Sequence, residues 1–127
     1  MSSEGDAQAW VAKAEEDFSM SRILLRRKRP LTSGVCFHAQ QCAEKYLKAL
    51  LIAHAQPFPR THDLRILSNL CEQAGMSIGI DLNRIDTLSF YAVQARYPGD
   101  EPTPEEASES FEIVKDVRRV ARQLLGV

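Results

Sequence analysis

Four polar side chains between residues 38 and 48 have the spacing of one helix face. They are His38, Gln41, Lys45 and Lys48, at successive offsets of three, four and three residues. On an α-helix these offsets place all four within about 80° of one another. Two ammonium groups, an amide and an imidazole presented together suit a phosphate or the polar edge of a base. The plain alternative is the solvated face of an amphipathic helix.

Two further pairs of residues could contact an anion. His62 and Asp63 fall where a helix is expected to begin, and the unpaired backbone N–H groups of a helix N-terminus attract anions. Arg96 and Tyr97 fall where another helix is expected to end, and there a cation also interacts well with the helix dipole. Each pair could equally serve the fold alone. We include His62, Arg96 and Tyr97 among the candidate ligand-binding residues.

Established catalytic and metal-binding patterns are absent from the sequence. It contains no GxGxxG, P-loop, HExxH or GxSxG motif, and its three histidines lack metal-ligand spacing. Cys36, Cys42 and Cys71 form no CxxC pair and fall in apolar surroundings, which is typical of reduced core thiols. A zinc site at Cys36, His38 and Cys42 would have a spacing that structural zinc sites do not favour. We therefore predict no metal, no cofactor and no catalytic residue.

Composition places the chain among ordered globular domains. Its 127 residues suffice for one hydrophobic core, and 44% of them are hydrophobic and 26% charged. No run of 18 apolar residues occurs, and the first residues lack the basic and apolar segments of a signal peptide. We expect a single cytoplasmic domain over residues 1–127, with an ordered core over about 7–125 and no membrane association.

Charge is unevenly distributed although the net charge is only −1. Between Arg22 and Arg60 there are eight basic residues and one acid, Glu44, whereas residues 99–112 hold six acids and no base. The basic run at 26–29 could meet a phosphate backbone or the acidic segment, or simply be a solvated helix end. We expect the molecule to be electrically two-sided.

Helical periodicity without any strand pattern predicts an all-α fold. Apolar residues recur at helical spacing over about 7–29, 32–55, 61–75, 82–95 and from 103 onward. Short connections between these segments favour antiparallel neighbours, so we predict an up-and-down antiparallel helical bundle of four main helices plus a shorter one. The second segment has an apolar arc of roughly 200°, so it should be the central helix.

Side-chain caps are expected at three helix starts. Thr32 or Ser33 could cap the second helix and Thr61 the third. Thr103 could cap the last helix, where Pro104 and the acids after it also suit the first turn.

Four segments that contain these candidates resemble a known family. They are Trp10-x2-Lys13-Ala14-Glu15-x-Asp17, the stretch FHAQQCAEKYLKALL within Cys36 to Leu51, Thr61-His62-Asp63-Leu64, and Ala95-Arg96-Tyr97-Pro98. In content and order they resemble the bacterial HEPN domain. The resemblance implies a helical bundle that commonly dimerises and associates with nucleotides or RNA. It also implies a minimal nucleotidyltransferase partner, because many members act with one as a toxin–antitoxin or related two-component pair.

Other HEPN proteins are ribonucleases whose composite site pairs an Arg with a His after four to six spacer residues. None of the positions five to seven residues before His38, His54 or His62 is an arginine. Lys48 has this spacing to His54, but lysine lacks the planar bidentate fork of arginine, and the two side chains project about 120° apart on one helix. This departure favours a non-catalytic member. An atypical ribonuclease toxin and a purely structural, partner-docking module are the alternatives.

The sequence thus predicts a non-catalytic HEPN homodimer that binds a nucleotide or RNA phosphate. It is expected to act with a nucleotidyltransferase partner in a toxin–antitoxin-like system. The predicted ligand-binding residues are Lys45 and Lys48 for phosphate, His38 and Gln41 for hydrogen bonds, and His62, Arg96 and Tyr97 at the neighbouring helix ends.

Overall fold

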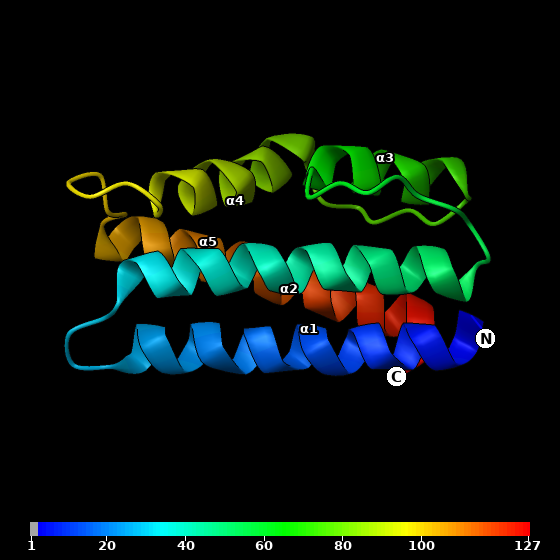
Figure 1. Cartoon of the computed structure of the whole chain (residues 1–127), viewed down its shortest axis with the longest axis horizontal. Helices are drawn as coiled ribbons and strands as arrows, with labels where there is room; N and C mark the ends of the chain where they lie inside the picture. Colours follow the sequence, from blue (N-terminus) through cyan, green and yellow to red (C-terminus); the bar gives the residue numbers. More distant parts are fainter. Residues whose placement is uncertain (1–2) are drawn as a thin grey trace.

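The computed structural model describes residues 3–127, with side chains described from residue 7 onward. This range contains no strand and five helices: α1 (Ser3–Arg26), α2 (Thr32–Ala53), α3 (Leu64–Gln73), α4 (Leu82–Gln94) and α5 (Pro104–Leu125) (Figure 1). The all-α bundle expected from the periodicity is confirmed. Helices α1, α2 and α5 have 24, 22 and 22 residues, whereas α3 and α4 have 10 and 13. None of the five is long and apolar enough to cross a membrane.

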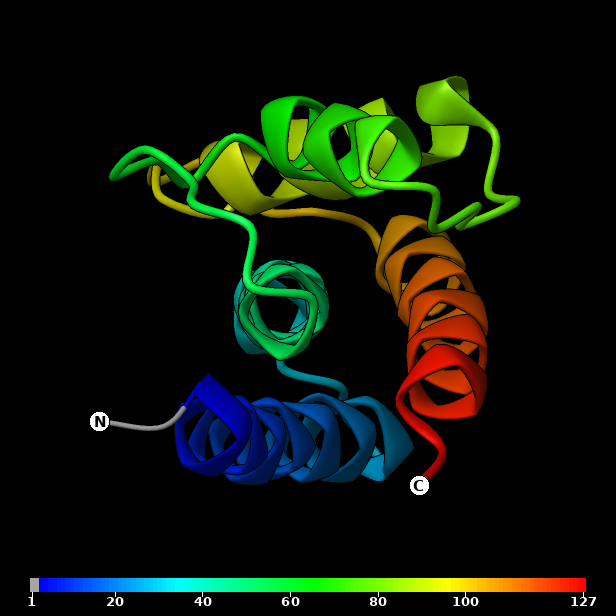
Figure 2. The ribbon, with the colours of Figure 1, turned by 90° about the vertical axis from the view of Figure 1, so that its right-hand side faces the viewer.

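Helix α2 is the central helix, as its wide apolar arc predicts. Viewed end-on in Figure 2, α1, α5 and the α3–α4 pair surround α2 on three sides. Thirteen of its 22 residues are buried. Within residues 3–127 no helix covers the fourth side of α2, which faces the viewer in Figure 1. The polar residues of α2 therefore lie along the seam between α1 and the α3–α4 pair.

The core is built from apolar side chains of all five helices. Leu47 and Leu50 of α2 are fully buried, as are Leu67 of α3, Leu88 of α4 and Val114 of α5. Burying each such side chain contributes on the order of 2 kcal/mol to the free energy of folding. This core fixes the relative positions of α2, α3 and α4.

All three cysteines lie in this core as free thiols, as predicted. Burial raises the pKa of each thiol, and for Cys71 the pKa reaches about 12. Buried neutral thiols behave as small apolar side chains.

The predicted cap of α2 is wrong. The N-cap is Leu31 rather than Thr32 or Ser33, and it makes no side-chain capping bond. The backbone N–H of Leu31 donates to the carbonyl of Leu24 at 3.2 Å, which ties the residue before α2 to the last turns of α1. The start of α2 is thus set by the close reversal of the chain.

The predicted cap of α3 is also displaced. Asp63 is the N-cap, and its carboxylate accepts hydrogen bonds from the backbone N–H groups of Arg65 and Ile66. Thr61 instead accepts a hydrogen bond from the backbone N–H of Asp63 at 3.0 Å, one step earlier in the turn. A carboxylate also interacts favourably with the positive end of the helix dipole.

The predicted cap of α5 is confirmed. Thr103 and Glu106 form a reciprocal capping box, in which each side chain accepts a hydrogen bond from the other residue's backbone N–H. Pro104 occupies the first turn, where its missing N–H costs nothing.

Candidate functional site

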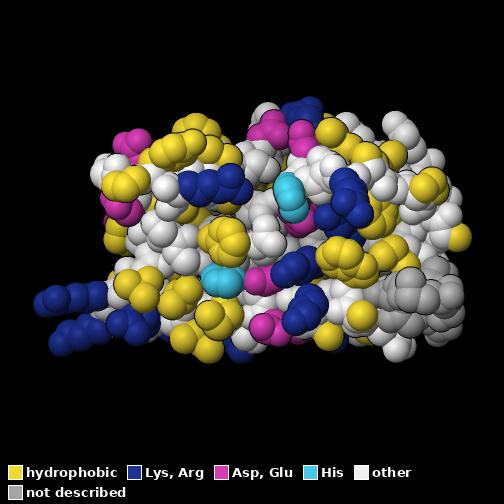
Figure 3. Space-filling view, in the orientation of Figure 1, with side chains coloured by type: hydrophobic (Ala, Val, Ile, Leu, Met, Phe, Trp, Pro, Cys, Tyr) yellow, Lys and Arg dark blue, Asp and Glu magenta, His cyan; other side chains and the backbone are white. Residues whose placement is uncertain are grey.

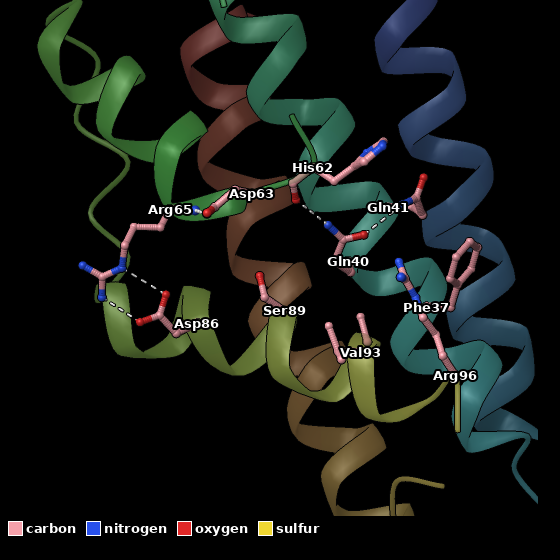
Figure 4. Close-up of a pocket in the computed structure, with 11 residues that line it drawn as sticks. Phe37, Gln40, Gln41, His62, Asp63, Arg65, Asp86, Ser89, Val93 and Arg96 are labelled. Carbon is pink, nitrogen blue, oxygen red and sulfur yellow. Dashed lines mark hydrogen bonds and ion pairs between the residues drawn. The ribbon is translucent and has the colours of Figure 1, made fainter. Parts of the chain in front are cut away.

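An open pocket of about 390 Å³ lies where α2, the start of α3 and the end of α4 meet (Figure 4). It is lined by three of the seven predicted ligand-binding residues, Gln41, His62 and Arg96. In Figure 4 the Arg96 side chain extends from the end of α4 toward Gln41, and the imidazole of His62 lies on the same side. Three separate segments therefore bring an amide, an imidazole and a guanidinium to one pocket, which we call the His62 pocket.

The imidazole of His62 is oriented by a buried carboxylate. Its Nδ1 lies 3.0 and 3.1 Å from the two carboxylate oxygens of Glu44. The side chain of His62 is 82% exposed, whereas that of Glu44 is only 3% exposed. Because the carboxylate accepts a hydrogen bond, the proton of a neutral His62 is held on Nδ1 and Nε2 keeps its lone pair. His62 can therefore accept a hydrogen bond or a proton at Nε2.

Glu44 also neutralises Lys48, which is buried on the next turn of α2. The ammonium of Lys48 donates to Glu44 Oε2 at 3.0 Å and lies 5.4 Å from the ring centre of Trp10 and 5.8 Å from that of Phe58. A buried ion is tolerated only with such compensation. Lys48 is thus an internal cation and does not line the His62 pocket.

Gln40 completes the hydrogen bonding around Glu44. Its amide nitrogen donates to Glu44 Oε1 at 3.3 Å and to the backbone carbonyl of His62 at 3.2 Å. Its amide oxygen accepts a hydrogen bond from Gln41 at 2.9 Å. Gln40 therefore ties the segment before α3 to α2 and helps to fix the position of His62.

His38 and Lys45 lie outside the pocket, on Asp17 of α1. His38 Nδ1 is 2.8 Å from Asp17 Oδ1, and the ammonium of Lys45 donates to Asp17 Oδ2. Both side chains are about three-quarters buried, and Asp17 is buried. These pairs join α2 to α1 across the open side of the bundle.

The four predicted polar residues of α2, His38, Gln41, Lys45 and Lys48, therefore serve mostly to hold the fold together, and we call this set the α2 brace. Of its four members only Gln41 lines the His62 pocket, whereas His38, Lys45 and Lys48 each hold a carboxylate. Figure 3 shows this kind of pairing at the surface, where two histidines each lie beside an acidic side chain. Gln40 and Glu44 are site residues that were not among the predicted ones. The available signal was the position of Glu44 four residues after Gln40 and four before Lys48.

Arg96 is the cation of the His62 pocket that has no ion-pair partner among the side chains described from residue 7 onward. Arg65, at the other end of the pocket, is paired with Asp86 at 2.6 and 3.1 Å, and this pairing lowers the pKa of Asp86. Tyr97 is exposed just beyond α4 and does not line the pocket. Arg96 is thus the group that can meet an anion there, whereas Nε2 of His62 can accept a hydrogen bond from a hydroxyl or N–H group of a ligand.

A metal site finds no support in the described side chains. From residue 7 onward no group of three or more His, Cys, Asp or Glu side chains is arranged to hold an ion. The chemistry of the pocket is instead that of an imidazole, a guanidinium and an amide, beside the apolar side chains of Phe37 and Val93.

Comparison with known proteins assigns the family. The HEPN domain model matches residues 7–124, nearly the whole chain. The chain belongs to the HEPN family. The resemblance carried by its sequence motifs is thereby confirmed, and the helical bundle is the fold of this family.

This HEPN domain is also similar to an archaeal protein. The protein of Methanocaldococcus jannaschii named "Putative toxin MJ1304" is 26% identical to it, over 94% of this chain and 88% of the relative. No solved structure matches the chain.

Proposed function

We propose that this HEPN protein binds the phosphate of a nucleotide or RNA in the His62 pocket. The observation that carries the proposal is the convergence of Arg96 with the carboxylate-oriented imidazole of His62 in one open pocket. A guanidinium presents a planar fork of donors to phosphate oxygens. Phe37 and Val93 offer apolar contact to a base, and the volume of about 390 Å³ is that of an ordinary small-molecule site.

The proposal divides the seven predicted residues into two groups. Gln41, His62 and Arg96 contact the ligand. The others, His38, Lys45, Lys48 and Tyr97, lie outside the pocket lining, and the first three hold the carboxylates that fix α2 and His62.

Family membership and the toxin-named relative support a role in a toxin–antitoxin-like system. We propose a homodimer that acts there with a minimal nucleotidyltransferase. Phe90 and Val93 are exposed one turn apart on α4, and Tyr97 is exposed just beyond the end of this helix. This apolar surface beside the pocket supports contact with a second protein.

Calorimetric titration with AMP, ATP and a short single-stranded RNA tests the binding proposal. The change Arg96→Ala should weaken binding at least tenfold, about 1.4 kcal/mol, because it removes the phosphate fork. His62→Gln should also weaken it. Lys45→Ala is the matched control, since Lys45 contacts Asp17 outside the pocket, and should bind like the wild type. Absence of binding by the wild type, or an equal loss in Lys45→Ala, would show that the pocket assignment is wrong.

A second candidate function, RNA cleavage, is favoured by the His62–Glu44 pair. A buried carboxylate on Nδ1 leaves Nε2 suited to act as a general base. In this reaction Nε2 takes the proton of an RNA 2′-hydroxyl, whose oxygen attacks the adjacent phosphorus. The bond to the 5′-oxygen breaks and that oxygen takes up a proton from water, which leaves a 2′,3′-cyclic phosphate. Arg96 lines the same pocket, although it comes from a segment distant from His62.

Incubation with an RNA oligonucleotide and its 2′-O-methyl analogue separates the two functions. Cleavage of the RNA but not of its analogue, with loss of this cleavage in His62→Gln, would support ribonuclease activity. Intact RNA at protein concentrations that saturate binding would leave the protein as a binding module.

A further inference from the structure

A second open pocket, of about 570 Å³, lies between α1 and α5 and is lined mainly by basic side chains. Figure 2 shows these two helices meeting at the corner of the bundle opposite α3 and α4. We call it the α1–α5 groove. Its basic lining residues are Arg22, Arg26, Lys115, Arg118, Arg119 and Arg122, and its one acidic lining residue is Asp116.

The positive charge of the groove is only partly neutralised by nearby acids. Arg118 is paired with Glu15 at 2.7 and 2.8 Å, and Arg119 with Asp116 at 3.3 Å. Asp116 is shared with Arg84, which approaches it to 2.8 Å from outside the groove.

The remaining groove cations are less well compensated. Lys115 is 3.1 Å from Glu112, and Arg122 is 3.9 Å from the Glu15 already bound by Arg118. Arg22 and Arg26 have no ion-pair partner among the side chains described from residue 7 onward. Six basic groups thus face three acids, and the groove keeps a net positive charge.

The cations form two rows with the period of the helix. On α5 they occur at residues 115, 118 or 119, and 122, about one per turn over roughly 10 Å. On α1, Arg22 and Arg26 are one turn apart, about 6 Å. Rows of this kind suit a chain of regularly spaced anions better than one isolated anion.

The lining of the groove offers no exposed aromatic anchor to a peptide. Phe18 and Phe111 stack with ring centres 5.3 Å apart, but each is only 7% exposed. The guanidinium of Arg118 covers Phe18 at 4.6 Å, and the ammonium of Lys115 lies 5.8 Å from the ring of Phe111. Protein partners usually bury apolar anchors at the centre of an interface, whereas binding to a nucleic-acid backbone is dominated by charge.

We propose that the α1–α5 groove binds the phosphodiester backbone of single-stranded nucleic acid without reading its sequence. The arginines supply forked donors to phosphate oxygens. Glu15 and the ring of Phe18 hold the guanidinium of Arg118 in place. No lining residue of this groove belongs to the His62 pocket. The proposal therefore does not depend on the function proposed for that pocket.

Fluorescence anisotropy of a labelled 12-nucleotide oligo(U) bound to the full chain tests this proposal. Between 50 and 200 mM salt, the logarithm of the association constant should fall with the logarithm of salt concentration. Each neutralised phosphate contributes about −0.7 to the slope, so four contacts predict about −3. In the double variant Arg26→Ala/Arg119→Ala the affinity should drop about tenfold or more, and the slope should flatten by about 1.4.

The double variant Lys28→Ala/Arg29→Ala is the matched control. It removes the same net charge from the exposed turn after α1, outside the groove, and should leave most of the affinity. An equal loss in both double variants would overturn the proposal, because net charge alone would then explain binding.

Competitors decide the ligand class. Oligo(dT) should compete about as well as oligo(U), since both carry the same backbone charge. Stronger binding of a duplex of equal length would overturn the single-strand assignment. Binding of a poly-Glu peptide in place of either oligonucleotide would overturn the nucleic-acid assignment and identify an acidic protein segment as the ligand.

Discussion

The α2 side chains beside the His62 pocket and those of the α1–α5 groove include cations and carboxylates in opposite arrangements. Beside the pocket, Lys45 and Lys48 each have their own buried carboxylate, Asp17 and Glu44. In the groove, four of the six basic groups share three acids, and Arg22 and Arg26 have no ion-pair partner among the side chains described from residue 7 onward. The identity of a basic residue therefore does not reveal whether its charge can reach a ligand.

The position of each helix explains the difference. Helix α2 is central, so a polar group on it must be paired within the fold or lose its solvation without compensation. Helices α1 and α5 are peripheral (Figure 2), and Arg26 and Arg119 on them are exposed. Pairing on the central helix fixes geometry, whereas excess charge on the peripheral helices is available for binding.

The largest effect is expected at Glu44. The change Glu44→Gln leaves the ammonium of Lys48 buried without a counter-charge, which should cost about 3–5 kcal/mol of unfolding free energy. Urea denaturation at neutral pH measures it. The control Glu112→Gln, at an exposed pair, should change stability by no more than about 0.5 kcal/mol. Similar losses in the two variants would break the distinction between buried and exposed pairing.

Glu15 gives an intermediate effect that depends on pH. Hydrogen bonds from Arg118, and then from Tyr46, lower its pKa below the ordinary value of 4.5, although burial opposes them. A carboxyl with a lowered folded-state pKa stabilises the fold above that ordinary value, and the stabilisation is lost as pH falls through the folded-state pKa. The wild type should therefore lose more stability than Glu15→Gln between pH 5 and about 3.

Urea midpoints of both proteins across that range measure the difference. Glu112→Gln again serves as the control and should retain the acid-dependent loss of the wild type. Parallel curves for the wild type and Glu15→Gln would show that this edge of the groove is not fixed by its carboxylate.

The smallest effect on stability is expected in the groove itself. Arg26→Ala removes an exposed cation from a like-charged surface, so the free energy of unfolding should change by less than about 0.5 kcal/mol. Lys48→Ala, measured in parallel, should be far more destabilising because it leaves Glu44 buried without its cation. A large loss in Arg26→Ala would mean that the groove is a structural element like the α2 brace.

The fold was largely predictable because its signals are local. Apolar periodicity and proline or glycine boundaries predicted five helical segments. The wide apolar arc of α2 predicted that this helix is central. The cap of α5 at Thr103 involves only the next three residues, so it was predicted from the sequence. The start of α2 at Thr32 was predicted, but its cap was not, because the N-cap is Leu31, whose N–H is bonded to Leu24 across a chain reversal.

The candidate site was less predictable because its contacts are distant in sequence. Lys45 was assigned to phosphate, yet it meets Asp17, 28 residues away on α1. Glu44 and His62 are 18 residues apart and meet only once the segment before α3 folds back over α2. In the groove, Arg118 reaches Glu15 across 103 residues. Such pairings follow from helix packing, which no local spacing encodes.

The carboxylate of Glu44 has a consequence for genetics. It is both the counter-ion that lets α2 stay buried and the group that orients His62. A screen for inactive alleles would therefore recover changes at residue 44 through reduced protein abundance in the cell, whatever they do to the pocket. Changes at the exposed His62 leave the Glu44–Lys48 ion pair intact. Substitutions at His62 therefore report on the function of the pocket, whereas substitutions at Glu44 report on the stability of the protein.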